Sequence, residues 1–160
     1  MVRQQRDFSC GTAALATLLT HYFLRPTSEA ELLEAAGSDG LRRQGVSLRA
    51  LASLAEARGL AATGVAVSAR ALDALRAPVI AWLAPRGQPH FAVLRGVSPG
   101  AVELADPARG NVRLSRAAFE RDFIGEDGRG RLLLLAAPAG TPVAAGYFSL
   151  RRPLPQLRPP

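Results

Sequence analysis

The sequence predicts an α+β domain, in which a helical first half is followed by an antiparallel β-sheet. Up to about residue 60, apolar residues recur at three- and four-residue intervals, which is the spacing of helices with a buried side. After residue 60, short apolar runs are bounded by Gly, Pro and Ser, which is the pattern of strands and turns. The 160 residues suit one domain, because compact domains mostly contain about 100–200 residues.

The first expected helix begins at Cys10 and runs to about Phe23. Its apolar residues repeat every three or four positions and predict an amphipathic helix. Pro26 follows and is expected to close the helix, since proline cannot continue one.

Two further helices carry their own capping signals. Ser28 and Glu31 form a capping-box pattern, and Gly37 is expected to end the helix that they open. Ser47 caps the next helix, for which Gly59 is the stop signal. These two short helices complete the helical half of the predicted domain.

The second half is expected to supply six strands and two short helices. A helix capped by Ser68 separates the first two strands, and a helix over 115–123 separates the last two. The turn at 98–100 joins the third and fourth strands as an antiparallel hairpin. The expected strands are 63–67, 79–83, 90–97, 102–105, 111–114 and 132–136.

Composition excludes several classes of protein. Apolar residues make up 48% of the chain and charged residues 21%, which is the balance of a globular protein. The longest apolar run, 132–137, is far shorter than the roughly 20 residues that a bilayer span needs, so no transmembrane segment is expected. A single cysteine excludes a disulfide framework and a zinc site built of several thiolates.

The net charge of +7 comes from 20 basic residues, all of which are arginine. Such a charge is compatible with binding to nucleic acid or to an anionic membrane surface. The arginines are scattered, however, with adjacent pairs only at 42–43 and 151–152, and no aromatic residues are interleaved with them for base stacking. We therefore expect no nucleic-acid partner and attribute the arginine content to a GC-rich genome.

The domain is expected to span residues 1–150, followed over 151–160 by a Pro- and Arg-rich tail that is unsuited to regular structure. No apolar signal-peptide segment follows Met1. Either the protein is cytoplasmic, or a leader precedes Met1 in the unprocessed protein. We expect a periplasmic location, with the cytoplasm as the alternative.

Cys10 is the first candidate for chemistry, because it lies where the first helix is expected to begin. Unpaired backbone N–H groups and the positive end of the helix dipole favour a thiolate at such a position. Gly11 follows it and is expected to leave the approach to the sulfur open. A lone cysteine is equally often a small buried apolar residue, and its place on a helix does not separate the two roles.

His90 and Asp106 are expected to lie close together. His90 opens one strand and Asp106 ends the next, so pairing across the turn at 98–100 places both at the same end of the hairpin. A carboxylate there fixes the imidazole tautomer and stabilises its charged form. Separately, each has a simpler explanation, since a lone His is mostly a surface or core residue and Asp-Pro often starts a turn. The other histidine, His21, is expected to be a solvated residue near the end of the first helix.

Gln4 lies six residues before Cys10, in a segment expected to be extended. Its side-chain amide could donate to the same oxygen as the backbone N–H of Cys10, which would form an oxyanion hole. Gln5 would point to the opposite side of an extended chain, so only one of the two can serve.

In this order, the residues resemble the C39 family of double-glycine leader peptidases, a group of papain-like cysteine peptidases. The resemblance covers nearly the whole chain, through the segments 4–15, 45–47, 90–94, 106–110 and 114–119. It implies a papain-like fold and no metal or organic cofactor. It also implies four roles: Cys10 as the nucleophile, His90 as general base and acid, Asp106 as its orienting carboxylate, and Gln4 as the oxyanion donor.

Two features differ from the best-known members of that family. In those members the domain is fused to a membrane-spanning ATP-driven exporter, and an acidic residue directly precedes the nucleophile, where this chain has Ser9. The chain therefore resembles the free-standing members, some of which accompany bacterial secretion systems, including those for functional amyloid. The Cys-Gly-Ser/Ala-Cys-aromatic signature of papain is absent, so close kinship with papain is not expected.

The function that this resemblance implies is a cysteine endopeptidase that supports bacterial secretion. Its substrate would be a leader peptide or a secreted protein, cut after a Gly-Gly type site, and secretion-system components would be further partners. The main alternative is a non-catalytic peptidase-like domain that binds a leader or a secreted partner. A second alternative is an acyl-transfer enzyme on the same scaffold, such as an amidase or a transglutaminase-like protein.

Overall fold

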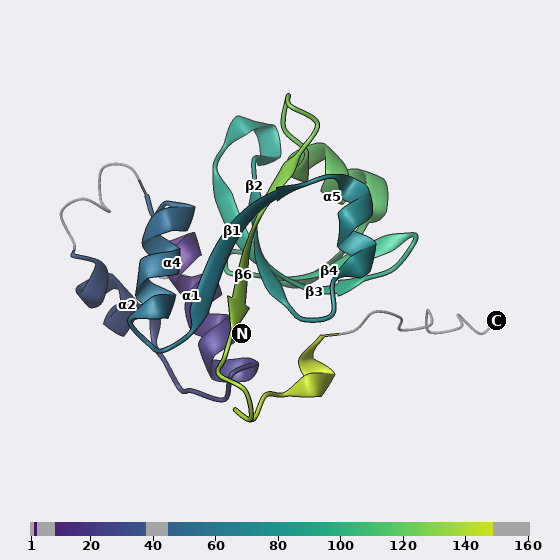
Figure 1. Cartoon of the computed structure of the whole chain (residues 1–160). Coiled ribbons are helices and arrows are strands. Elements are labelled where there is room, and N and C mark those ends of the chain that lie inside the picture. The colour runs from purple at the N-terminus through teal and green to yellow at the C-terminus, as the bar shows by residue number, and fades with distance from the viewer. Residues whose placement is uncertain (1, 3–8, 38–44, 149–160) are drawn as a thin grey trace, which may run out of the picture.

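The computed structural model describes residues 2, 9–37 and 45–148. These residues form the predicted α+β fold, in which a helical group packs against a curved sheet (Figure 1). The helices α1 (Cys10–His21), α2 (Glu29–Ala36) and α4 (Leu48–Glu56) gather on one side of the sheet, and α5 (Arg116–Phe123) lies on the other. No helix in the described parts of the chain is long and apolar enough to cross a membrane.

Helix α1 is buried on every side, which corrects the prediction of an amphipathic helix. All ten residues from Cys10 to Leu19 are buried, because the sheet covers one side of the helix and α2 and α4 cover the others. The helix also ends at His21, well before Pro26, so the proline does not close it. The chain turns instead at Leu24, whose φ of 56° lies in the left-handed region.

The capping signals of α2 and α4 are confirmed. The Ser28 hydroxyl accepts a hydrogen bond from the Glu31 backbone N–H, and the Glu31 carboxylate accepts one from the Ser28 backbone N–H, at 3.2 and 2.6 Å. The hydroxyl of Ser47 accepts from the backbone N–H of Ala50 at 3.1 Å and so caps α4. Each bond satisfies a backbone group that the first turn of a helix leaves unpaired.

The six predicted strands are all present and form one sheet in the order β1-β6-β2-β3-β4-β5, with every neighbouring pair antiparallel. The helix predicted over 115–123 is α5, and Ser115 caps it by accepting from the Ala118 backbone N–H. Ser68 makes no side-chain capping bond, and the helix after it, η1 (Ala69–Ala74), is a 3-10 helix. The strand bounds are β1 Ala61–Val67, β2 Val79–Leu83, β3 His90–Val97, β4 Ala101–Asp106, β5 Gly110–Ser115 and β6 Gly130–Ala136.

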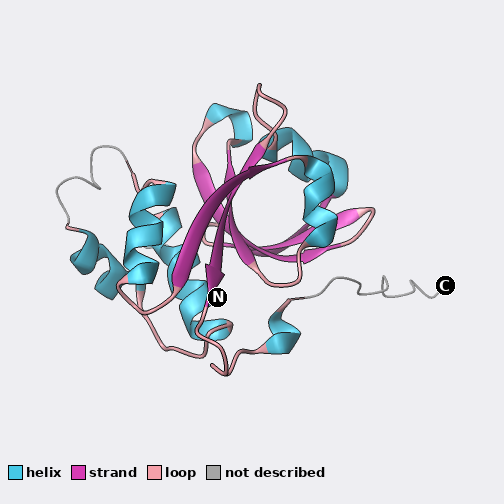
Figure 2. Cartoon of the chain, viewed as in Figure 1, coloured by secondary structure: helices cyan, strands magenta, loops and turns pink. Residues whose placement is uncertain are grey.

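Helices lie over both faces of the sheet (Figure 2), and the residues packed on each face are apolar. On one face, side chains of α1 and α4 meet Phe91, Val93 and Leu133. On the other face, Phe119 and Phe123 of α5 pack among the sheet residues together with η1. The start of β3 is thereby held against α1, which positions the candidate site.

After β6 the chain returns toward α1. The backbone N–H of Ala144 donates to the carbonyl of Tyr22 at 2.8 Å, and a short 3-10 helix, η3 (Ala145–Tyr147), follows. The expected tail over 151–160 lies outside the described residues, so its boundary with a domain over 1–150 stays a prediction.

Candidate active site

Cys10 is the first residue of α1, as predicted, and its side chain reaches the surface only at the edge of a cleft. The residue is 9% exposed and packs in the apolar core between the helices and the sheet. The chain turns into the helix at Ser9, whose carbonyl accepts from the Thr12 hydroxyl at 2.9 Å and from the Ala13 backbone N–H. The N-terminal end of the helix therefore points its unpaired backbone N–H groups toward the thiol.

Gly11 serves close packing, and its expected role in keeping the approach to the sulfur open stays a prediction. A methyl group on Gly11 would lie 3.2–3.3 Å from side-chain carbons of Val46, Leu51 and Phe91. Glycine thus lets the first turn of α1 approach β3 and the start of α4 closely. This approach brings Cys10 next to the strand that begins with His90.

His90 opens β3 and Asp106 ends β4, as predicted, and the register of the hairpin brings them together. Val97 pairs with Val102 and Gly96 with Glu103, but a bulge at Arg95 then shifts the register by one residue. Continuing the shifted register places Asp106 level with Ala92 instead of Val93. The bulge therefore moves the carboxylate one position closer to His90.

The three predicted residues converge in the structure. The Nε2 atom of His90 lies 3.1 Å from Oδ2 of Asp106, and the Cys10 side chain is near enough to His90 to act on the charge of the imidazole. The His90 side chain is 15% exposed, and that of Asp106 is fully buried. The imidazole therefore lies between a thiol and a carboxylate that water does not reach.

This arrangement favours a charged imidazole. Burial by itself lowers the pKa of His90, but the hydrogen bonds and negative charges of Asp106 and Cys10 outweigh it and raise the pKa to about 9. Burial likewise raises the pKa of Asp106, but the bonds to His90 and Arg109 dominate and hold it well below its ordinary value. Both shifts stabilise an imidazolium–carboxylate pair at neutral pH.

Arg109 is a member of the site that was not predicted as one. Its Nε and Nη2 atoms lie 3.0 and 2.9 Å from Oδ2 of Asp106. The only sequence signal was its place three residues after Asp106, in the Asp-Pro segment, and that spacing by itself does not indicate that Arg109 contacts the carboxylate. Its side chain is half exposed, whereas the carboxylate that it contacts is buried.

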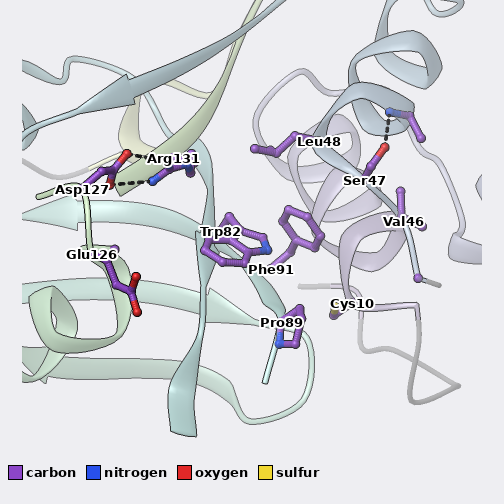
Figure 3. A pocket seen from close by; sticks show the side chains of 13 residues that line it. Cys10, Val46, Ser47, Leu48, Trp82, Pro89, Phe91, Glu126, Asp127 and Arg131 are labelled. Carbon is purple, nitrogen blue, oxygen red and sulfur yellow. Dashed lines mark hydrogen bonds and ion pairs between the residues drawn. The ribbon is translucent and has the colours of Figure 1, made fainter. Parts of the chain in front are cut away.

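The cleft beside Cys10 has a volume of about 990 Å³. Val46, Ser47 and Leu48 line one wall, and Trp82 and Phe91 line the middle. The far end is charged and is lined by Glu126, Asp127 and Arg131. Figure 3 shows Cys10 and these charged residues on opposite sides of the two aromatic rings. Sequence reasoning missed these lining residues, because they come from four separate segments.

The remaining predicted residues lie apart from this cluster or outside the described chain. His21 is at the opposite end of α1 from Cys10, where it stacks on Tyr147 with ring centroids 6.3 Å apart. It is half-buried instead of solvated, and burial is the main cause that lowers its pKa. Gln4 and Gln5 lie outside the described residues, so the oxyanion role of Gln4 stays a prediction.

A thiol at a helix start, beside an imidazole paired with a buried carboxylate, is the arrangement of cysteine peptidases, and the α+β fold that carries it is papain-like. The comparison with protein families agrees: the model of the Peptidase C39 family matches residues 1–127. The chain belongs to this family, which confirms the resemblance found in the sequence.

Two individual relatives each match most of this chain. A Pseudomonas aeruginosa protein named "Probable functional amyloid protease FapD" is 33% identical over 129 residues, which cover 78% of this chain and 57% of FapD. The chain thus spans little more than half the length of that relative. An uncharacterised protein of Methanothermobacter marburgensis is 37% identical over 125 residues, which cover 78% of this chain and 83% of the relative.

Solved structures support the fold. The peptidase domain of Streptococcus ComA, a bi-functional ABC transporter involved in quorum sensing, superposes with a TM-score of 0.73 at 22% identity, covering 85% of this chain and 96% of that domain. A double glycine motif protease from an AMS/PCAT transporter, solved in complex with its leader peptide, gives a TM-score of 0.65 at 25% identity and covers 86% and 90% of the two chains.

Proposed function

We propose that this protein is a cysteine endopeptidase whose reaction is carried by Cys10, His90 and Asp106. The observation that supports this most directly is the place of His90, which pairs with the buried Asp106 carboxylate and whose charge is stabilised by Cys10 as well. A binding domain has no need for an imidazolium held in that position. Cys10 lines a cleft that is large enough for a peptide.

In the first half of the proposed reaction, the imidazolium of His90 holds the proton that the Cys10 thiol has given up, and the Cys10 sulfur attacks the scissile carbonyl carbon. Since Nε2 of His90 is bonded to Asp106, the other ring nitrogen serves the sulfur. In this proposal the oxygen that becomes negative accepts hydrogen bonds from the backbone N–H of Cys10 and from the Gln4 amide, whose role stays a prediction. His90 then gives its proton to the leaving amine as the C–N bond breaks.

The second half releases the thioester. His90, now neutral, takes a proton from a water molecule, whose oxygen attacks the thioester carbonyl carbon. The C–S bond breaks, the acid product leaves, and His90 keeps the proton that it took from water beside the freed sulfur. Asp106 keeps the imidazole oriented throughout and stabilises its positive charge whenever it forms.

The proposed substrate is a leader peptide or a secreted protein with a Gly-Gly type site. The solved relative that is a double glycine motif protease with a bound leader peptide supports this substrate class. The relative named a probable functional amyloid protease, FapD, supports a functional amyloid protein as the kind of substrate. Secretion-system partners and a periplasmic location belong to the same proposal.

The test uses synthetic peptides that share a central Gly-Gly pair, with products identified by mass spectrometry. We expect cleavage after the pair by the wild type, none by Cys10→Ala, and a large loss for His90→Ala. His21→Ala is the matched control, because it removes the other histidine about 17 Å further along the same helix. The control is expected to keep its activity, and thermal melting checks that each variant is folded.

A thiol-directed electrophile gives a second readout that needs no substrate. We expect Cys10 to be labelled faster in the wild type than in His90→Ala, because His90 removes the thiol proton. Equal labelling of both, together with peptide binding without cleavage, would support the non-catalytic alternative and overturn the proposal. Products that join the acyl group to an added amine instead of water would support an acyl-transfer enzyme.

A further inference from the structure

One oxygen of Asp106 serves two cations. Oδ2 lies 3.1 Å from Nε2 of His90, and 3.0 and 2.9 Å from Nε and Nη2 of Arg109. The imidazole and the guanidinium therefore share the negative charge at a single atom. A carboxylate shared in this way stabilises each cation less than it would stabilise one alone.

The other oxygen of Asp106 is held by the backbone. Oδ1 accepts hydrogen bonds from the backbone N–H groups of Ala108 and Arg109, at 2.9 and 3.1 Å. These two bonds fix the carboxylate in the turn between β4 and β5, whatever side chain stands at position 109. The Arg109 side chain is therefore not required to place the carboxylate, and its contact with Oδ2 has an electrostatic consequence instead.

We propose that Arg109 is a positioning residue that limits how strongly Asp106 stabilises the His90 imidazolium. This inference rests on the proposed function for its consequence: an imidazolium that is held too strongly is a poor acid toward the leaving amine. Arg109 keeps the His90–Asp106 pair strong enough to orient the ring and weak enough to release the proton. Arg109 is not among the residues that line the cleft, and it acts through Asp106.

The sign of the effect follows from the charges that bear on His90. Among the described residues these are Cys10 on α1, Asp106 on β4 and, through Asp106, Arg109 in the turn that follows. Removing the positive charge of Arg109 leaves the whole charge of Oδ2 to His90, so the pKa of His90 rises. The guanidinium is 51% exposed and partly screened by water, so we expect a rise of about half a unit to one unit.

The experiment follows the His90 ring signals by NMR through a pH titration, in Cys10→Ala and in Cys10→Ala/Arg109→Met. The Cys10→Ala background lets the imidazole titrate without a coupled thiol. A His21→Ala variant loses the ring signals of His21 and so identifies those of His90. Arg113→Met is the matched control, because it removes the same charge from an exposed position on β5. We expect the pKa of His90 to rise in the Arg109 variant and to stay unchanged in the control.

Two further variants separate charge from packing. Arg109→Lys keeps the charge without the forked geometry, so the pKa of His90 in this variant should lie close to its value in Cys10→Ala alone. Arg109→Gln removes the charge but keeps a polar side chain, so it should behave like Arg109→Met and replace it if Met impairs folding. In the active protein, the alkaline limb of the pH–rate profile should move up with the NMR value, and kcat should fall about threefold to tenfold.

An unchanged or lowered pKa of His90 in folded Arg109→Met and Arg109→Gln would overturn the inference. So would a pKa in Arg109→Lys that matches Arg109→Met. The NMR result needs no turnover, so its outcome is independent of the proposed function. A wild type that cleaves nothing, with the expected NMR shift, would defeat the peptidase proposal and leave the electrostatic role of Arg109 standing.

Discussion

The substitution Asp106→Asn tests whether the charge of this buried carboxylate sets the protonation of His90. Asparagine keeps an oxygen that can accept from the backbone N–H groups of Ala108 and Arg109, so the turn is retained. It lacks the negative charge that Oδ2 presents to His90 at 3.1 Å. Because burial by itself lowers the pKa of His90, we expect the pKa to fall well below 9 in this variant.

The pKa shift gives the size of the effect on stability. A rise from 6.5 to about 9 corresponds to roughly 3 kcal/mol of interaction with the charged ring, to which Asp106 and Cys10 both contribute. Since the folded-state pKa is the higher one, this stabilisation is fully present below pH 6.5 and is lost as the pH rises through 9. We therefore expect Asp106→Asn to cost about 2 kcal/mol more at pH 6 than above pH 9.

Urea unfolding at the two pH values measures this difference as a change in the free energy of unfolding. Asp73→Asn is the matched control, because it removes a carboxylate from the ion pair with Arg116, which stays charged throughout this pH range. Its cost should be the same at both pH values. An equal cost of Asp106→Asn at both pH values would refute the reasoning, since it would mean that Asp106 does not stabilise the charged form of His90.

Three other predictions follow from the same structure. Turnover should persist to about pH 9 and fall above it, as His90 loses its proton, and a stopped assay across pH 6–10 measures this limb; a decline centred near pH 6.5 would contradict it. Gln4→Ala should lower kcat about 10²–10³-fold, less than His90→Ala does, while Gln5→Ala should leave it unchanged; an effect of Gln5→Ala alone would show that the other glutamine serves. Gly130→Ala should destabilise the fold by several kcal/mol, because the added methyl overlaps the buried ring of Phe123, and a melting temperature close to that of the wild type would be incompatible with this packing.

The sequence by itself determined most of the local structure, because the signals that specify it act over a few residues. The capping box of Ser28 and Glu31 and the cap at Ser47 depend on groups three positions apart, and both are present. The starts and ends of β2 and β3 follow from short apolar runs bounded by Pro and Gly. Where the neighbours decide, the prediction failed: α1 is buried all round because other elements cover its polar side.

For the candidate site, the sequence placed His90 near Asp106, because two strands joined by a tight turn must be neighbours. The bulge at Arg95, which adjusts their register, has no local signal in the sequence. The meeting of Cys10 with His90 joins residues 80 positions apart, and it depends on how closely α1 packs against β3 over Gly11. Only the tertiary structure decided this contact, because it arises from packing between segments whose sequences carry no information about each other's position. The tertiary structure also decided the sharing of Oδ2, because the spacing of Arg109 three residues after Asp106 does not specify that both Arg109 and His90 reach the same oxygen.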